Sequence, residues 1–175
     1  QLPAMFLPGI TLVVSPLLSL MKDQIDFLVE HKIPAARLDS TQSLEEYNHV
    51  LEQAKLEKLK ILMIAVERFK NERFRHHLKQ MRVALMVVDE AHCISEWGHN
   101  FRPEYLKLPV YQKEFQISQS LLLTATATEE VQEDMCRKFN ISRENMTVTG
   151  FYRKNLFLQV TPTTEDSKNE KLLKR

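Results

Sequence analysis

Glycine is scarce in this sequence, which holds only Gly9, Gly98 and Gly150 among its 175 residues. None of the three opens the pattern G-x-x-x-x-G-K-[ST], whose backbone amides and lysine cradle nucleotide phosphates. The sequence therefore contains no phosphate-binding loop of that kind.

Cysteine, long apolar runs and net charge are also in short supply. The two cysteines, Cys93 and Cys136, form no C-x-x-C pair, so the sequence supports neither a zinc site nor a disulfide framework. No apolar run approaches the length that spans a bilayer, and the N-terminus shows no signal-peptide pattern, so we expect no membrane association. The net charge of +1 predicts no bulk attraction to nucleic acid, which would have to be held locally by loops and backbone amides.

Short apolar runs alternate with segments of helical periodicity along the chain. The runs predict strands at residues 11–14, 35–38, 61–65, 85–88, 121–123 and 146–149. Helices are expected at residues 17–28, 43–56, 67–79 and 129–139, and a loop followed by a helix is expected over residues 93–115. This alternation predicts an α/β fold in which right-handed crossovers build a parallel sheet with helices on both faces.

The most informative segment is Asp89-Glu90-Ala91-His92, which directly follows the apolar run 85–88. Two carboxylates at the carboxyl end of a buried parallel strand lie where open α/β sheets bind their ligands. One acid can hold Mg²⁺ through water, and the next can orient or deprotonate an attacking water. The plainer alternative is a helix start, at which Asp89 or Glu90 complements the helix dipole.

Polar residues follow the other strong strands as well. Ser15-Pro16 follows the first of them, Glu67-Arg68 the third, and Thr124-Ala125-Thr126 the run 121–123. Because the carboxyl ends of parallel strands share one edge, we expect these residues to meet there. Each has a plainer explanation, since Ser and Thr can cap helices and Glu67-Arg68 can be a solvated helix start. Their recurrence after every strong strand favours a shared site.

Five segments stand in the order of a known motif series: TLVVSPLLSLMKDQ (11–24), LDSTQS (38–43), ILMIAVERF (61–69), VVDEAH (87–92) and LLTATAT (122–128). With them, the chain resembles the first RecA-like domain of a superfamily 2 helicase. The segment CISEWGHNFRPEY (93–105) is similar to the aromatic-rich loop that marks RecQ DNA helicases, and FYRKNL (151–156) resembles the end of that domain. Four residues depart from the family pattern: Val66, Glu96, Asn100 and Lys154.

The resemblance implies an ATP-dependent enzyme that uses ATP and Mg²⁺. Asp89 would bind Mg²⁺ through water, and Glu90 would position and activate the hydrolytic water. His92 would report the nucleotide state to the hydroxyl groups of Thr124 and Thr126. For His92 the plainer alternative is a capping or buried histidine.

The resemblance also implies a loop that couples hydrolysis to DNA, formed by Trp97, His99, Phe101 and Arg102. Exposed aromatic rings can stack on unpaired bases, and arginine can contact phosphate. Ordinary core positions are the alternative for Trp97 and Phe101, although Gly98 and the interleaved polar residues favour a loop. The other expected contacts with single-stranded DNA, mostly to phosphates, are Ser15, Pro16, Leu17, Ser40, Thr41, Glu67 and Arg68.

The implied organisation is a partial RecA-like domain over residues 1–162, truncated at its N-terminus, followed by a tail or linker at 163–175. The linker would lead to a second RecA-like domain of the same parent chain. Without the P-loop strand, a sheet edge is expected to stay unpaired, which weakens the fold or promotes association. The fragment alone is accordingly expected to be inactive.

The parent protein is expected to unwind duplex DNA with 3′-to-5′ polarity in recombination and repair, and to bind single-stranded and partly duplex DNA. Its expected location is intracellular, in the cytoplasm with the nucleoid if bacterial and in the nucleus if eukaryotic. Two alternatives remain open: a superfamily 2 motor that acts on RNA, and a non-catalytic lobe that only binds DNA.

Overall fold

The computed structural model describes residues 1–98, 100–150, 155–157, 160 and 162, and it divides into two units. Residues 1–145 form an α/β unit. The described residues of the second unit, 146–175, contain no helix or strand, so the strand predicted at 146–149 is wrong. Residues 147–149 are exposed, and no strand of their own unit pairs with them among the described residues. The predicted tail at 163–175 lies outside the described residues.

The centre of the first unit is a five-stranded parallel sheet in the order β2-β3-β1-β4-β5. Its strands are β1 (Ile10–Val14), β2 (Ala35–Leu38), β3 (Ile61–Ile64), β4 (Val83–Val88) and β5 (Ser120–Leu122). The predicted strands at 11–14, 35–38, 61–65, 85–88 and 121–123 are therefore present, and all run in parallel. Every residue of β3 and the last four of β4 are buried, as expected of strands covered on both faces.

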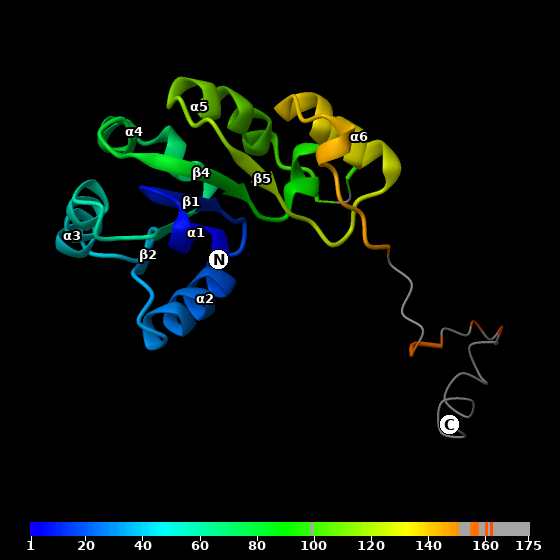
Figure 1. Cartoon of the computed structure of the whole chain (residues 1–175). Coiled ribbons are helices and arrows are strands. Elements are labelled where there is room, and N and C mark those ends of the chain that lie inside the picture. Colours follow the sequence, from blue (N-terminus) through cyan, green and yellow to red (C-terminus); the bar gives the residue numbers. More distant parts are fainter. Residues whose placement is uncertain (99, 151–154, 158–159, 161, 163–175) are drawn as a thin grey trace, which may run out of the picture. The chain divides into compact units, whose positions relative to one another are not determined.

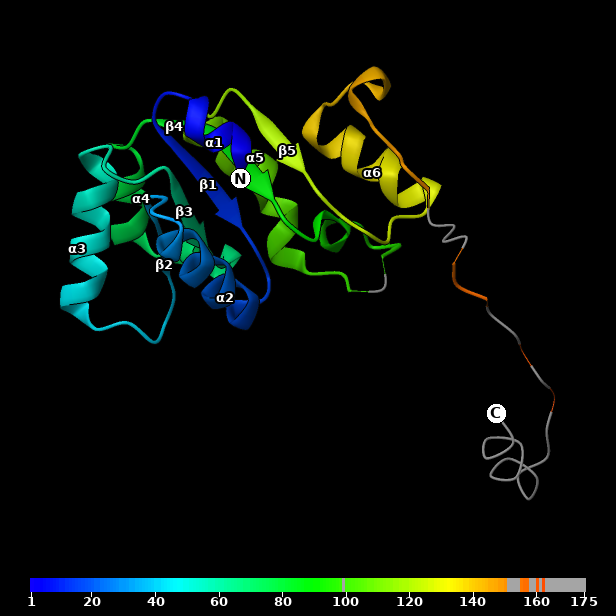
Figure 2. The ribbon, with the colours of Figure 1, turned by 60° about the horizontal axis from the view of Figure 1, so that its bottom comes forward.

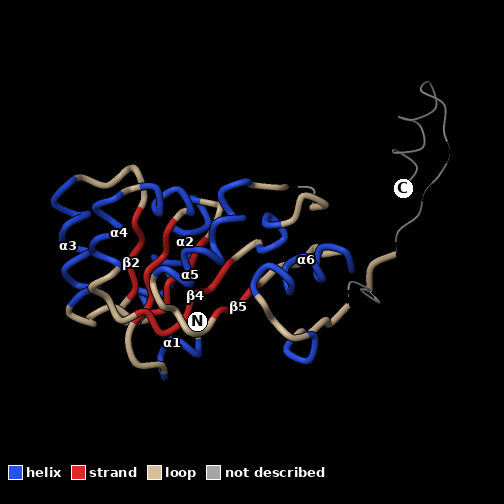
Figure 3. Tube along the Cα trace, turned by 90° about the horizontal axis from the view of Figure 1, so that it is seen from above, coloured by secondary structure: helices blue, strands red, loops and turns tan. Residues whose placement is uncertain are grey.

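Helices cover both faces of this sheet, which confirms the predicted α/β architecture. On one side lie α1 (Leu2–Phe6) and α2 (Leu18–Glu30), which pack Ala4, Met21 and Leu28 against the strands (Figure 1). On the other side lie α4 (Glu72–Leu78) and α5 (Leu108–Glu114) (Figure 1). Seen from above, the strands lie between the helices (Figure 3). The remaining helices are α3 (Leu44–Lys55) and α6 (Glu129–Phe139), of which α6 lies beside β5 (Figure 1, Figure 2).

Two of the predicted helices are broken into shorter pieces. The segment 67–79 forms a 3-10 helix, η1 (Val66–Lys70), and then α4, because the Asn71 side chain accepts a hydrogen bond from the Phe74 amide at 2.9 Å and starts a new helix. The segment 93–115 becomes η2 (Ala91–Ile94), a loop, η3 (Pro103–Lys107) and α5. The chain ends its first unit with η4 (Arg143–Asn145).

Strand β5 forms one border of the sheet. It pairs with β4, and the described residues supply no strand on its other side. Leu121 and Leu123 are exposed there. Weak stability or association through this edge stays a prediction. Among the described residues, no helix is long and apolar enough to cross a membrane.

Phe69 anchors the face of the sheet that carries α4 and α5. Its ring is fully buried, stacks on Tyr111 at 4.4 Å between centroids and meets Phe74 edge-on at 5.9 Å. Since aromatic pairs add to the free energy of burying each ring, this cluster fixes η1 against α4 and α5.

We expect Phe69→Ala to lower the free energy of unfolding by about 3–5 kcal/mol, because the truncation leaves a cavity among these rings. Urea-induced unfolding followed by circular dichroism measures the loss. Phe27→Ala is the matched control, since that ring on α2 is 52% exposed. Equal losses in the two variants would contradict the anchoring role of Phe69.

Candidate functional site

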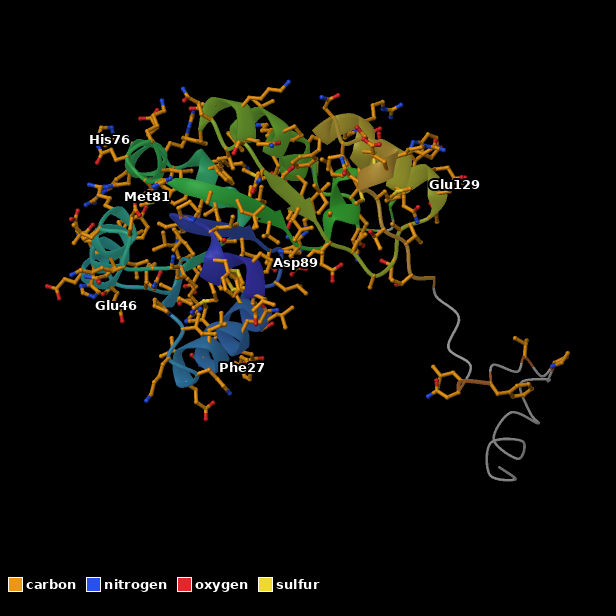
Figure 4. All side chains as sticks on the ribbon, in the orientation of Figure 1. Phe27, Glu46, His76, Met81, Asp89 and Glu129 are labelled. Atoms are coloured by element: carbon orange, nitrogen blue, oxygen red, sulfur yellow. The ribbon has the colours of Figure 1, made fainter. Side chains whose placement is uncertain are left out.

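The register of the sheet brings the strand ends together at one edge. Val14 on β1 is aligned with Ile64 on β3 and with Val88 on β4. Beyond these positions the ladder continues, with the Asp89 amide donating to the Val14 carbonyl at 2.9 Å and the Leu123 amide to the Val88 carbonyl at 2.9 Å. Met81, before β4, and Asp89, after it, mark the two ends of this strand (Figure 4). The expected shared edge is present.

Asp89 is held in a fixed orientation at this edge. Its Oδ2 accepts a hydrogen bond from the Ser15 hydroxyl and its Oδ1 accepts one from the Glu90 amide, each at 3.0 Å. The carboxylate is half-buried, so it keeps access to solvent. Ser15 itself is 2% exposed and Leu17 is the N-cap of α2, so capping by Ser15 is wrong. The Ser15 side chain serves Asp89, and its contact with DNA stays a prediction.

Glu90 adopts a left-handed backbone conformation, with φ 48° and ψ 45°. For a residue other than glycine this conformation costs of order 1–3 kcal/mol, and such strain gathers at functional sites. Glu90 is the N-cap residue of η2, as the helix-start alternative expected, although its side chain makes no capping hydrogen bond. The turn places Glu90 Oε2 3.2 Å from Nδ1 of His92.

His92 links the acidic pair to the segment that follows β5. It is 3% exposed, as the plainer alternative required, yet its Nδ1 also lies 2.8 Å from the Thr124 hydroxyl oxygen. That oxygen accepts a hydrogen bond from the Thr126 amide at 3.3 Å, while Thr126 itself is exposed. Because His92 contacts both Glu90 and Thr124, a displacement of either one reaches the other through the imidazole.

A pocket of about 640 Å³ opens beside the ends of β1, β2 and β3. Among its lining residues are five of the predicted ones: Pro16, Ser40, Glu67, Arg68 and Arg102. Sequence reasoning missed Lys70 and Asn71, which also line it. Lys70 could have been found, because it is three residues after Glu67 and residues three apart are neighbours on the face of the predicted helix. Leu17 and Thr41 are exposed residues next in sequence to the lining residues Pro16 and Ser40.

The buried acid that lines this pocket, Asp39, has partners of its own, so cations of the pocket are available to a ligand. Buried Asp39 forms an ion pair with Arg37 and accepts bonds from the Thr41 hydroxyl at 2.5 Å and the Thr41 amide at 2.8 Å. Burial raises the pKa of Asp39, but the Thr41 hydrogen bonds and the positive charges of Arg37 and Arg68 bring it below its ordinary value. Asp39 therefore stays ionised and internally satisfied.

Two cations of the pocket, Arg68 and Lys70, are held in place by neighbouring residues. The Arg68 guanidinium lies 5.5 Å from the centroid of the Tyr47 ring, and its Nε donates to the Leu38 carbonyl at 3.4 Å. Lys70 Nζ lies 3.0 Å from Glu104, and this hydrogen bond raises the pKa of Lys70. Together with Arg102, these residues give the pocket three cations that suit phosphate groups.

The aromatic loop, residues 95–102, begins immediately after η2. Trp97 is 79% exposed, so a core position for it is wrong, while Phe101 is half-buried. A Cβ on Gly98 would lie 2.7 Å from the His92 carbonyl oxygen, so only glycine fits this turn. The Arg102 amide donates to the Cys93 carbonyl at 2.9 Å and closes the loop. His99 lies outside the described residues.

The acidic pair also fits the requirements of Mg²⁺. This cation binds hard oxygen ligands, and it commonly keeps waters while using one or two carboxylates together with phosphates. Asp89 and Glu90 are half-buried oxygen donors at an open edge. Within the described part of the chain, no group of three or more His, Cys, Asp or Glu residues could enclose a metal ion. The residues present fit a water-mediated Mg²⁺ at Asp89 rather than a protein cage.

Comparisons with known proteins agree with this geometry. The family model described as DEAD/DEAH box helicase matches residues 4–134. The ATP-dependent DNA helicase RecQ of Bacillus subtilis is 44% identical over 161 residues, which are 91% of this chain and 27% of that protein. The ATP-dependent DNA helicase Q5 of Mus musculus is 38% identical over 167 residues, 91% of this chain and 17% of that protein. The chain thus spans between 17% and 27% of the length of these relatives.

A solved structure shows the same fold. The helicase domain of Hef from Pyrococcus furiosus matches with a TM-score of 0.54 at 18% identity, over 79% of this chain and 29% of that chain. With its parallel sheet, its acidic pair and these relatives, the chain belongs to the DEAD/DEAH box helicase family, has the RecA-like α/β fold, and falls with the RecQ helicases that its sequence resembles.

Proposed function

We propose that this chain is part of an ATP-dependent DNA helicase of the RecQ family, in which it supplies the hydrolytic carboxylates and part of the DNA-binding surface. One observation carries the proposal. One stretch of the sequence carries the acidic pair, His92, the exposed Trp97 and Arg102, which lines the cationic pocket. A chemical site and a candidate DNA surface are thereby joined by about a dozen residues of one chain.

The residues of the acidic pair divide the work of hydrolysis. When bound, Mg²⁺ supplies positive charge that offsets the charge of the ATP phosphates. The Ser15 hydroxyl and the Glu90 amide hold the Asp89 carboxylate, whose remaining lone pairs would accept hydrogen bonds from water bound to Mg²⁺. The Glu90 carboxylate orients the attacking water and accepts its proton. His92 contacts both Glu90 and Thr124, so a movement of Glu90 displaces the imidazole and, through it, Thr124.

The cationic pocket and Trp97 hold unpaired DNA. Arg68, Lys70 and Arg102 contact phosphates, which carry no sequence information, and the Trp97 ring stacks on a base. The remaining elements of the proposal come from the likeness to RecQ: 3′-to-5′ unwinding of duplex in recombination and repair, and single-stranded and partly duplex DNA as partners. The compartment then follows the DNA, the nucleoid in a bacterium or the nucleus in a eukaryote.

Two parts of the machinery are proposed to come from elsewhere in the parent protein. The chain has no G-x-x-x-x-G-K-[ST] segment, so the loop that cradles the phosphates is supplied from outside these residues. The second RecA-like domain supplies an arginine that stabilises the transition state. The chain by itself is therefore expected to hydrolyse no ATP.

In the complete parent protein, Glu90→Gln should lower the ATPase kcat by about 10²–10⁴-fold, because the amide cannot accept the proton of the attacking water. Hydrolysis is measured with and without single-stranded DNA or RNA. Glu30→Gln, the same change at an exposed glutamate at the end of α2, is the control. Stimulation by RNA in preference to DNA would favour an RNA motor, and DNA binding without stimulated turnover would favour a non-catalytic lobe.

Trp97→Ala should weaken the binding of single-stranded DNA by about 1–3 kcal/mol, because one base loses its stacking partner. Fluorescence anisotropy of a labelled oligonucleotide measures the affinity. Phe6→Ala removes an equally exposed ring, 80% against 79%, from α1. A similar loss in both variants would argue against stacking at Trp97.

Lys70→Gln should reduce the slope of log K against log[salt] for single-stranded DNA by about 0.7, the value for one lost phosphate contact. The matched control is Lys79→Gln. That lysine is 59% exposed against 55% for Lys70, and it also faces a glutamate, Glu114 at 3.7 Å. An unchanged slope for Lys70→Gln would remove Lys70 from the phosphate-binding surface.

A further inference from the structure

A buried acid lines the cationic pocket. Asp39 directly follows β2, and it is 3% exposed. A buried carboxylate is costly unless it is paired and hydrogen-bonded, and a negative charge near a phosphate opposes binding of that phosphate. The charge of Asp39 is therefore unfavourable for the proposed use of this pocket. Its hydrogen bonds indicate what the side chain contributes instead.

The carboxylate of Asp39 folds the chain after β2 into a tight turn. Its Oδ1 accepts hydrogen bonds from the Thr41 amide at 2.8 Å and the Thr41 hydroxyl at 2.5 Å, while its Oδ2 pairs with Arg37. An aspartate that accepts from the backbone two residues later forms an Asx turn. Because Asp39 and Thr41 flank Ser40, these bonds fix the backbone of Ser40.

The side-chain amide of Gln42 holds the same turn. Its Oε1 accepts a hydrogen bond from the Asp39 amide at 3.0 Å, and its Nε2 donates to the Arg37 carbonyl at 3.0 Å. Between these two backbone groups, the Leu38 carbonyl accepts from Nε of Arg68 at 3.4 Å. The turn is thus fixed at both ends and contacts one cation of the pocket.

Ser40 is the residue that this turn leaves available to a ligand. It is exposed and lines the pocket, and its amide and hydroxyl donate to no acceptor among the described residues. The amides of Asp39 and Thr41 are already used within the turn. Backbone amides and serine hydroxyls are common donors to the phosphate oxygens of DNA. Ser40 therefore supplies two unused donors to the pocket.

We propose that Asp39 and Gln42 are positioning residues, which hold the amide and hydroxyl of Ser40 in place for one phosphate of single-stranded DNA. The inference rests on the proposed function, because it concerns how the same pocket binds DNA. Neither side chain contacts the phosphate, and both act through the backbone of the turn. The hydrogen bonds of Asp39 strengthen DNA binding, whereas its negative charge weakens it.

Two substitutions of Asp39 in the complete parent protein separate these opposite effects. Asp39→Asn removes the charge and keeps an oxygen that can accept from Thr41, so single-stranded DNA should bind as tightly as before or more tightly. Asp39→Ala removes both the charge and the acceptor. Binding should then weaken about tenfold or more, the effect of a lost hydrogen bond to a charged group. Fluorescence anisotropy of a labelled oligonucleotide measures both affinities.

The salt dependence of binding separates the positioning of Ser40 from a general loss of the pocket. Counterions are released when lysine or arginine neutralises a phosphate, and the donors of Ser40 are uncharged. Asp39→Ala should therefore lower the affinity at every salt concentration and leave the slope of log K against log[salt] unchanged. A collapsed turn that displaces Arg68 would instead reduce the slope by about 0.7.

Gln42→Leu gives a second variant with no change of charge, should Asp39→Ala fail to fold. It removes the bonds to the Asp39 amide and the Arg37 carbonyl, and it should weaken binding with the same unchanged slope. Ser43→Ala is the matched control, because it removes the N-cap contact with the Glu46 amide and leaves the turn in place. Its affinity should stay at the value of the unsubstituted protein.

Ser40→Ala tests whether Asp39 acts through Ser40. It removes the hydroxyl and keeps the amide, so it should weaken binding less than Asp39→Ala does. Combined with Asp39→Ala, it should weaken binding no further than Asp39→Ala alone, because both changes act on one phosphate contact.

Three outcomes would overturn the proposal: equal affinities of Asp39→Asn and Asp39→Ala, a reduced salt slope in Asp39→Ala and Gln42→Leu, or additive losses in the double variant. Failure of the proposed function looks different. In that case the unsubstituted protein itself binds no single-stranded DNA, and the positioning role falls with it.

Discussion

The parallel pairing of β4 between β1 and β5 is the constraint on which the site depends. The Asp89 amide continues the ladder to β1, and the Leu123 amide continues the ladder to β4 from the other side. A slip of one residue in either pairing would turn every side chain of the shifted strand to the opposite face. Asp89 would then lose Ser15, and His92 would lose Thr124. Burial of β4 on both faces makes such a slip expensive, since Met86 and Val88 are buried on one face and Val87 is buried on the other.

Polar groups inside this edge are retained because each one has a partner from a different element. The Ser15 hydroxyl donates to Asp89, and the Thr124 hydroxyl contacts Nδ1 of His92. Buried polar contacts of this kind add little net stability, but leaving one member unpaired is costly. They therefore favour one arrangement of the edge over its alternatives. The strained backbone of Glu90 persists in the same way, because the ladder on one side and η2 on the other hold it.

The sequence predicts the sheet well and the side-chain partners poorly, and the reason is physical. An apolar run such as 85–88 is a local sign of a buried strand, and five strands predicted in this way are present. The strand predicted at 146–149 is wrong, because no strand of its own unit pairs with that run among the described residues. The helix break at Asn71 could have been predicted, because asparagine is a preferred N-cap residue and here it lies inside a predicted helix. The contact of Ser15 with Asp89 could not have been predicted, because it joins residues 74 apart that only the fold brings together.

The charge balance of the chain shapes how the proposed surface can work. A net charge of +1 gives little long-range attraction, and the pocket cations lie among acids, with Glu67 lining it and Glu104 paired to Lys70. Under the proposed function, binding of DNA would therefore depend on a few short-range phosphate contacts and on the ring of Trp97. Contacts of this kind are individually weak and do not depend on sequence. Weak contacts suit a motor that releases and rebinds one strand many times, because each release then has a small free-energy cost. A strongly basic surface would make each release more costly.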